Sequence, residues 1–416
     1  MNPSALTREL LGDLPLPELV SFYQDLHAHP ELSMREHRTA SRLAGSLRAA
    51  GYETTEGVGG TGVAALLRNG DGPVVLLRAD LDALPLAEET GLPYASTVEG
   101  VMHACGHDLH TTCLAGAARA LAEGRDAWSG TLLVIGQPGE ETAEGALAML
   151  RDGLFDRFPR PDVALGQHVG PAPAGSIGHR AGLIMSAAVN VDIRIFGRGG
   201  HGASPELCVD PVVTAAYLVT RLQTVVSREI AATEPVVLTV GQIRAGTKAN
   251  IIPEDAHVVL NLRTRSQAAR DRVVAAVHRI AEAECAASGC PRPPLITTSS
   301  DFPVTVNDAD VDARVRAVHE DLFGAEAVVD YGPLMGSEDF PIFGMPEHNG
   351  GTPVPYAFWF FGGTGIDEWV AAEGDTPMEK VMNLPANHTP RFAPDAGPSV
   401  RSGVTALTAA ALAYLS

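Results

Sequence analysis

The stretch from His103 to Asp108 has the sequence His-Ala-Cys-Gly-His-Asp and gathers a thiol, two imidazoles and a carboxylate beside a glycine. Its spacing allows Cys105 and His107 to reach one divalent ion, because Gly106 relaxes the backbone between them. Thiolate and imidazole are both good ligands for zinc and similar ions. We therefore expect a metal site here; the structural alternative is a buried cysteine next to a core histidine.

Three other stretches supply further ligand types near the ends of apolar runs. They are Gly139-Glu140-Glu141, Gly166-Gln167-His168 and Asn387-His388-Thr389-Pro390. In open α/β sheets, the carboxyl ends of strands are where sites are built. Together with the first motif, these stretches indicate a metal-dependent hydrolase. The alternatives are two acids favoured by a helix N-terminus for the glutamate pair, a satisfied core histidine for His168 and a surface histidine for His388.

The two adjacent glutamates are expected to do different jobs. Neighbouring carboxylates on an extended turn point to different sides. One can therefore bind metal while the other, near the attacking water, takes its proton as a general base. Asp80 and Asp82 lie at the end of the run 74–82, which begins with the apolar segment Val74–Leu77. We expect Asp82 to orient a metal-bound histidine, with Asp80 as a second candidate for that role.

Two readings from other classes compete with a metal hydrolase. Cys105 could be a nucleophile activated by His107, in an enzyme that survives a chelator but is killed by a thiol alkylator. That reading leaves the glutamate pair and His388 unexplained. The chain could also be a non-catalytic protein that binds metal or an amino acid, and the intact Glu140 argues against this.

The composition excludes several classes of partner. The chain has 416 residues and a net charge of −20, which argues against nucleic acid and anionic membrane surfaces. No segment approaches the about 20 apolar residues of a membrane helix. The five scattered cysteines do not suggest a disulfide framework. Cytoplasmic residence is therefore the default expectation. An anionic substrate would need local cationic groups.

The elements that must position these residues alternate between helix and strand. Helical patterns cover Leu16–His27, Glu36–Ala50 and the Ala-rich segment His110–Leu121, and short buried strands are expected at Val74–Leu77, Thr131–Ile135 and Val163–Leu165. Helices between short apolar strands indicate an α/β fold, with a mixed sheet covered by helices.

From Val189 onward the pattern changes to strand, helix, two strands and a helix. This order predicts an inserted, ferredoxin-like α+β domain with four strands and two helices. We expect residues 1–180 and 295–416 to form the two parts of a catalytic domain and residues 181–294 the insertion. Within the insertion, a glycine-rich turn presents His201. The turn is not a phosphate-binding loop, because no Lys-Ser/Thr pair follows it.

Motifs in this order and at these spacings resemble a known family. They are His27–Leu32, Arg78–Pro85, His103–Asp108, Gly136–Glu141, Gly199–Pro205, Met335–Phe340 and His388–Phe392. The chain resembles the amidohydrolase branch of the aminoacylase and zinc-carboxypeptidase superfamily over nearly its whole length. That branch includes hippurate hydrolases, N-acyl-amino-acid amidohydrolases and auxin-conjugate hydrolases.

The resemblance implies a site with two divalent metal ions. By matching motifs, Cys105 bridges the ions, Glu140 is the general base, and the remaining ligands are His107, Glu141, His168 and His388. The stricter carboxypeptidases of the superfamily have an aspartate where Cys105 stands. A thiolate favours Zn²⁺, while carboxylate and imidazole also accept Mn²⁺, Co²⁺ or Ni²⁺. The implied reaction is hydrolysis of N-acyl-L-amino acids, and the runner-up is a metallo-dipeptidase or carboxypeptidase of the same superfamily.

The resemblance also gives the inserted domain a role as lid and dimerisation domain of a homodimer. His201 would reach the active site of a neighbouring protomer and stabilise the oxyanion. Asn250 and Arg263 match residues that hold the free carboxylate of the substrate. Glu206 is a departure, because many relatives carry a histidine at that position.

Overall fold

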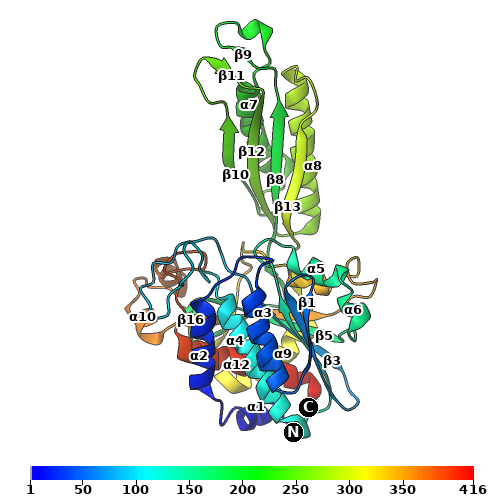
Figure 1. The fold of residues 1–416 in the computed structure, drawn as a ribbon, viewed down its shortest axis with the longest axis vertical. Coiled ribbons are helices and arrows are strands. Elements are labelled where there is room, and N and C mark those ends of the chain that lie inside the picture. The colour runs from blue at the N-terminus through cyan, green and yellow to red at the C-terminus, as the bar shows by residue number, and fades with distance from the viewer. Residues whose placement is uncertain (1) are drawn as a thin grey trace. The chain divides into compact units, whose positions relative to one another are not determined.

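The computed structural model describes residues 2–416, which separate into two compact units (Figure 1). The first unit contains the chain up to Ile184 together with Val306–Gly332 and Asp339–Ser416, and the second contains Met185–Thr305 and Pro333–Glu338. The second unit thus takes in residues 295–305 and 333–338, which the expected division placed in the catalytic domain. The reason is that strand β13 (Leu295–Phe302) pairs with β8 of the inserted sheet.

The first unit is built on an eight-stranded mixed sheet with the strand order β1-β2-β4-β3-β5-β16-β6-β15. The strands are β1 (Glu53–Val58), β2 (Gly62–Asn69), β3 (Val74–Asp80), β4 (Gly130–Gln137), β5 (Val163–Pro173), β6 (Ile177–His179), β15 (Val328–Asp330) and β16 (Tyr356–Thr364). The central strands β4, β3, β5 and β16 are parallel to one another. Their carboxyl ends therefore meet at the same edge of the sheet.

Helices cover this sheet, as the sequence analysis predicted. They are α1 (Pro3–Leu10), α2 (Leu16–His27), α3 (His37–Ala49), α4 (His107–Glu123), α5 (Gly145–Arg151), α6 (Leu154–Arg157), α9 (Ala309–Phe323), α10 (Ile366–Ala371), α11 (Pro377–Asn383) and α12 (Ala396–Leu415). Helix α4 is buried along almost its whole length between α2, α12 and the sheet. Its many alanines make this possible, because small side chains let the neighbouring helices approach closely.

The second unit is an antiparallel sheet with the order β10-β12-β8-β13 and two helices. Its elements are β8 (Ala187–Phe196), β9 (Gly200–His201), α7 (Pro211–Thr224), β10 (Val236–Ala245), β11 (Ile251–Ile252), β12 (Asp255–Thr264) and α8 (Gln267–Ala287). Burial alternates strictly along β12, because α7 and α8 cover one face of the sheet. This confirms the predicted ferredoxin-like insertion.

The remaining elements are short. Strands β7 (Gly182–Met185) and β14 (Thr305–Asn307) lie where the chain passes from one unit to the other. The short helices are η1 (Arg125–Ala127), η2 (Pro205–Leu207), η3 (Val225–Glu229) and η4 (Phe340–Phe343). None of the helices described between residues 2 and 416 is long and apolar enough to cross a bilayer.

Candidate metal centre

Three neighbouring parallel strands bring the predicted residues to one edge of the large sheet. Asp82 lies two residues beyond the end of β3, and Glu140 and Glu141 follow β4 after a short turn. His168 lies within β5, which continues to Pro173 and is therefore longer than the buried run 163–165 predicted. The strand order β4-β3-β5 makes these segments adjacent.

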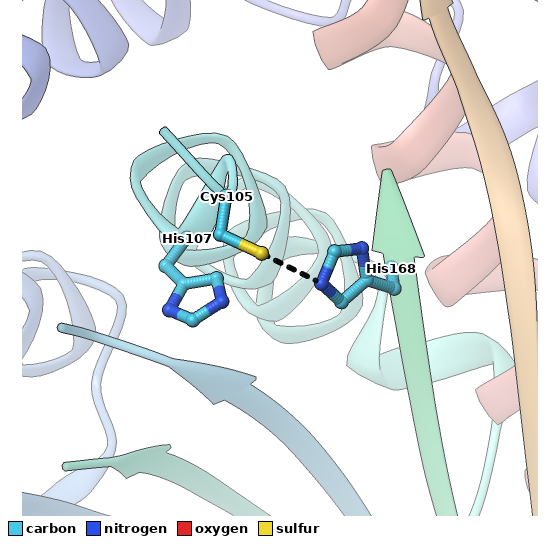
Figure 2. Close-up of side chains that lie close together, drawn as sticks. All are labelled: Cys105, His107 and His168. Carbon is cyan, nitrogen blue, oxygen red and sulfur yellow. Dashed lines mark hydrogen bonds between the residues drawn. The ribbon is translucent and has the colours of Figure 1, made fainter. Parts of the chain in front are cut away.

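Cys105 and His107 reach the same place because the chain turns sharply at Gly106. This residue has a φ of 86°, in the left-handed region that favours glycine, and it immediately precedes α4. A Cβ atom on Gly106 would lie 2.3 Å from Val169 Cγ1, so the loop can press against β5 only without a side chain. As a result, Cys105 Sγ lies 3.4 Å from His168 Nε2 (Figure 2).

Hydrogen bonds fix which ring nitrogen each buried histidine presents. His168 Nδ1 donates to the Val169 carbonyl at 2.7 Å, which leaves the Nε2 lone pair facing Cys105. His107 Nδ1 lies 3.1 Å from Asp82 Oδ1, and its buried Nε2 has no hydrogen-bond partner among the described residues. Both histidines therefore point an Nε2 lone pair into the space beside the thiol, as metal ligands do.

His388 and Glu141 close the cluster from two other loops. His388 Nε2 lies 3.2 Å from Cys105 Sγ and 3.2 Å from Glu141 Oε1. His388 has a φ of 64°, a conformation that costs a non-glycine residue roughly 1–2 kcal/mol. Its backbone N–H donates to the Ala104 carbonyl at 2.7 Å, which helps to hold it there.

Glu140 lies beside the cluster and is buried. Its Oε2 is 3.9 Å from His107 Nε2. Glu140 and Glu141 each have an oxygen within 4.8 Å of a His107 nitrogen, but only Glu141 also groups with Cys105 and His388. The two neighbouring carboxylates are therefore not equivalent, and this agrees with two different jobs.

Asp82 orients two of the candidate ligands at once. Its Oδ1 is bonded to His107 Nδ1, while its Oδ2 accepts from the Glu141 backbone N–H at 3.0 Å and from Ser33 Oγ at 2.7 Å. Asp82 belongs to none of the groups of converging donor atoms. It thus acts on the cluster through its neighbours.

Three further positioning residues had no role in the sequence analysis. Asn387 Nδ2 donates to the carbonyls of Cys105 at 3.1 Å and Val169 at 3.2 Å, and so ties its own loop to the Cys105 loop and to strand β5. His110 Nδ1 bonds Asp80 Oδ1 at 2.6 Å, while its Nε2 accepts from the Val169 N–H at 2.8 Å. Ser33 supports Asp82. The position of His110 one helical turn after His107 was the only signal available in the sequence.

The electrostatics of the cluster suit a cation. The Cys105 sulfur and then the Glu141 carboxylate, against the effect of burial, raise the pKa of His388 to about 10. Burial opposes ionisation of His107, but the negative charges of Asp80 and Cys105 raise its pKa well above the usual value. Burial, and then His110, lower the pKa of His168, so that its lone pair stays free. The site attracts positive charge and retains a neutral imidazole ligand.

The donor atoms fit metal ions. Cys105 forms one group with His107 and His168 and another with Glu141 and His388, and within each group the donor atoms lie within 4.8 Å of one another. Sulfur, imidazole nitrogen and carboxylate oxygen are the ligand types expected for zinc and related ions. Since the two groups share Cys105, the arrangement is compatible with a thiolate between two ions.

The other predicted residues, His201, Asn250 and Arg263, lie in the second unit. His201 on β9 faces Ile251 of β11, and the Gly202 N–H donates to the Asn250 carbonyl at 2.9 Å, so His201 and Asn250 are neighbours. Arg263 lies near the other end of β12, where its guanidinium bonds Asn261 Oδ1 and the Met335 carbonyl. Eight residues of strand after Asp255 correspond to roughly 26 Å. One protomer therefore does not bring Asn250 and Arg263 together.

Comparisons with known proteins agree with this architecture. Residues 76–380 match Peptidase family M20/M25/M40. The chain is 35% identical to N-acetyl-L-cysteine deacetylase of Bacillus subtilis strain 168 over 372 residues, covering 89% of this chain and 84% of that protein. It is 37% identical to hippurate hydrolase of Campylobacter jejuni over 329 residues, covering 78% of this chain and 85% of that protein. The solved structure of Bacillus subtilis YXEP, described as a dinuclear metal binding peptidase of the M20 family, matches with a TM-score of 0.72 and 29% identity, covering 95% of this chain and 98% of that one.

Proposed function

Because the chain belongs to the amidohydrolase branch of peptidase family M20/M25/M40, we propose that it hydrolyses N-acyl-L-amino acids to a carboxylate and an amino acid. The observation that carries the proposal is the convergence of four ligand side chains on Cys105, next to the buried Glu140. The ligands we assign are Cys105, His107, Glu141, His168 and His388. The relatives named for hippurate and N-acetylcysteine motivate the substrate class.

Two divalent ions bound at this cluster would polarise the amide carbonyl and make a water nucleophilic near neutral pH. The thiolate of Cys105 favours Zn²⁺, and the carboxylate and imidazole ligands also accept Mn²⁺, Co²⁺ or Ni²⁺. The protein residues supply the remaining steps. Asp82 holds His107 and Glu141 in place, so that the ligands are already oriented before substrate arrives.

We assign the general base to Glu140. It is buried beside the ligand cluster, and it does not join Cys105 in either donor group. In this place beside the ligands, its carboxylate would take the proton from the attacking water. The same carboxylate would then return that proton to the nitrogen of the leaving amine, as acid–base catalysis of amide hydrolysis requires.

The residues of the second unit support a homodimer. His201 and Asn250 lie together before the start of β12, whereas Arg263 lies roughly 26 Å along that strand from Asp255. If Asn250 and Arg263 hold the same substrate carboxylate, they must therefore come from different protomers. We place His201 and Asn250 at the substrate of a neighbouring subunit, where His201 stabilises the oxyanion. A local arginine is needed to hold the anionic substrate, because the chain as a whole carries a net charge of −20.

A second candidate is a metallo-dipeptidase or carboxypeptidase, because the matching structure of Bacillus subtilis is described as a peptidase. The two activities differ in the group on the acyl side of the amide bond that is cleaved. An acyl-amino-acid hydrolase accepts a neutral acyl group there, whereas a dipeptidase must bind a free amine. The ligand cluster and Glu140 would serve either reaction.

The test is hydrolysis of hippurate, N-acetyl-methionine and an alanyl dipeptide by chelator-stripped and metal-reloaded protein. Replacing Glu140 by Gln removes the base and is expected to lower kcat by about 10²–10⁴-fold. The matched control is Glu144→Gln, the same change on an exposed side chain four residues away, which should leave kcat unchanged.

The outcomes separate the hypotheses. Metal-restored cleavage of the acyl-amino acids that is lost in Glu140→Gln supports the proposal. Cleavage of the dipeptide alone would favour the peptidase. Activity that survives the chelator but not a thiol alkylator would indicate a nucleophilic Cys105. Two bound ions without any turnover would favour a binding protein.

A further inference from the structure

Two cysteines of the second unit occupy paired positions at the end of helix α8. The helix ends at Ala287, and Gly289 follows in the left-handed region with a φ of 70°. The Gly289 N–H donates to the Ala286 carbonyl at 3.1 Å, and the Cys290 N–H donates to the Cys285 carbonyl at 2.9 Å. These two bonds define a Schellman motif, in which the side chains of the two residues joined by the outer bond come into contact. Here those residues are Cys285 and Cys290.

The two thiols are in contact but differ in exposure. Cys285 is 2% exposed and belongs to the hydrophobic core of the second unit, while Cys290 is half-buried and packs against that core. Both are free cysteines. Burial, and then the neighbouring Cys290 sulfur, raise the pKa of the Cys285 thiol to about 12. A reagent in solution therefore reaches Cys290 first and finds Cys285 both shielded and protonated.

Contacts on both sides hold this helix end in place. On the helix side, Glu284 Oε1 lies 3.4 Å from Arg221 Nε of α7. After the pair, the guanidinium carbon of Arg292 lies 3.4 Å from the centre of the Phe196 ring at the end of β8. Because the backbone hydrogen bonds of the motif already bring Cys285 and Cys290 together, we expect that joining the two sulfurs needs little movement of the chain.

We infer that Cys285 and Cys290 form a reversible dithiol–disulfide site that is oxidised by low-molecular-weight disulfides such as glutathione disulfide. The Cys290 thiolate attacks one sulfur of the reagent, whose S–S bond breaks and releases one glutathione as thiolate. The Cys285 sulfur then attacks the Cys290 sulfur and displaces the second glutathione. Both protein thiols are oxidised, one reagent disulfide is reduced, and the two protons lost by the protein end on the two released thiols.

The new bond would connect the end of α8 to the segment 291–294 that leads into β13. In a reducing compartment the pair stays as thiols, and it closes when the ratio of disulfide to thiol rises. The other half-buried cysteine of this unit, Cys208, contacts the Ser204 carbonyl and provides an internal comparison.

The test is oxidation of the metal-loaded, full-length protein with glutathione disulfide, followed by denaturation, alkylation and tryptic mass spectrometry. No Lys or Arg lies between Arg279 and Arg292, so both cysteines fall in one tryptic peptide. Closure makes this peptide lighter by two hydrogen atoms and removes both alkyl labels. Dithiothreitol should then restore both labels.

Two single variants distinguish closure from simple adduct formation. Cys285→Ser should accumulate a stable glutathione adduct on Cys290, because no second thiol is present to displace it. Cys290→Ser should give neither closure nor an adduct on the shielded Cys285. Cys208→Ser, the matched control, should leave closure unchanged. A wild-type peptide that keeps a stable glutathione adduct on Cys290, or that keeps both alkyl labels, would overturn the inference.

Discussion

Replacing Asp82 by Asn tests whether the metal centre depends on a residue that does not bind metal. The wild-type carboxylate accepts from three donors: His107 Nδ1 at 3.1 Å, the Glu141 N–H at 3.0 Å and Ser33 Oγ at 2.7 Å. An asparagine has the same shape but only one oxygen. If that oxygen faces Glu141, the amide nitrogen faces His107 and favours the ring tautomer with hydrogen on Nε2, which cannot bind metal. If that oxygen faces His107, the side-chain NH₂ group faces the Glu141 N–H, and two hydrogen-bond donors then point at each other.

Either orientation of the amide leaves one buried donor without its acceptor, which costs about 1–3 kcal/mol. Loss of a partner that orients a ligand typically lowers metal affinity by about 10–100-fold. At about 1.4 kcal/mol for each tenfold change, this corresponds to about 1.4–2.8 kcal/mol. The cost of the unsatisfied donor and the typical loss of metal affinity thus agree. We therefore expect zinc affinity to fall by about one to two orders of magnitude.

The assay is competition for Zn²⁺ against a chromophoric chelator, with circular dichroism to show that the fold is retained. Asp71→Asn, the same change on an exposed turn between β2 and β3, is the control and should bind zinc like the wild type. Wild-type affinity in a folded Asp82→Asn protein would refute the role we give to Asp82. An equal loss in Asp71→Asn would show that the effect comes from overall charge and not from ligand orientation.

Two further predictions concern residues outside the ligand set. Asn387→Ala removes the bonds to the Cys105 and Val169 carbonyls, so zinc affinity in the same competition assay should fall about tenfold or more, while Asn383→Ala, which loses an exposed bond, should not change it. Burial, and then His179, lower the pKa of His319 to about 3. The His319 imidazole therefore binds a proton more readily in the unfolded chain than in the folded one. As the pH falls from 7 to 5, this difference should lower the free energy of unfolding by about 2 kcal/mol. The measurement is urea unfolding of the wild type and of His319→Gln at both pH values. The difference in the free energy of unfolding between the two pH values should be smaller by about 2 kcal/mol in the variant. An equal difference in both proteins would contradict the role given to His319.

The sequence was sufficient to predict the sheet, its helices and the inserted domain, because each has a strong local pattern. The run 74–77 is continuously apolar, which is typical of a strand buried on both faces, and residues 189–195 alternate, as expected of a strand covered on one face. Ligand types at the ends of apolar runs likewise predicted which segments would meet, and the strand order β4-β3-β5 makes them neighbours.

The positioning residues could not be predicted in the same way. Asn387 contacts the Cys105 carbonyl across 282 residues of sequence, and Ser33 contacts Asp82 across 49. Neither contact has a local signature, since an amide in a Pro-rich loop and a serine in a turn are ordinary surface residues. Their roles arise only from the tertiary fold, which brings their hydrogen-bonding groups to carbonyl and carboxylate oxygens beside the ligands.

The second unit shows why a role inferred from a motif must be checked against the positions of the residues in the structure. Asn250 and Arg263 were both assigned to one substrate carboxylate, and each assignment is reasonable by residue type. Asn250 precedes strand β12 and Arg263 lies near its end, and the strand from Asp255 to Arg263 is roughly 26 Å long. An arginine side chain cannot span that gap. Either one of the two assignments is wrong or, as proposed above, the site is completed by two chains. The pairing of β9 with β11 places His201 beside Asn250, so the two residues proposed to act on a neighbouring subunit lie at the same end of the second unit.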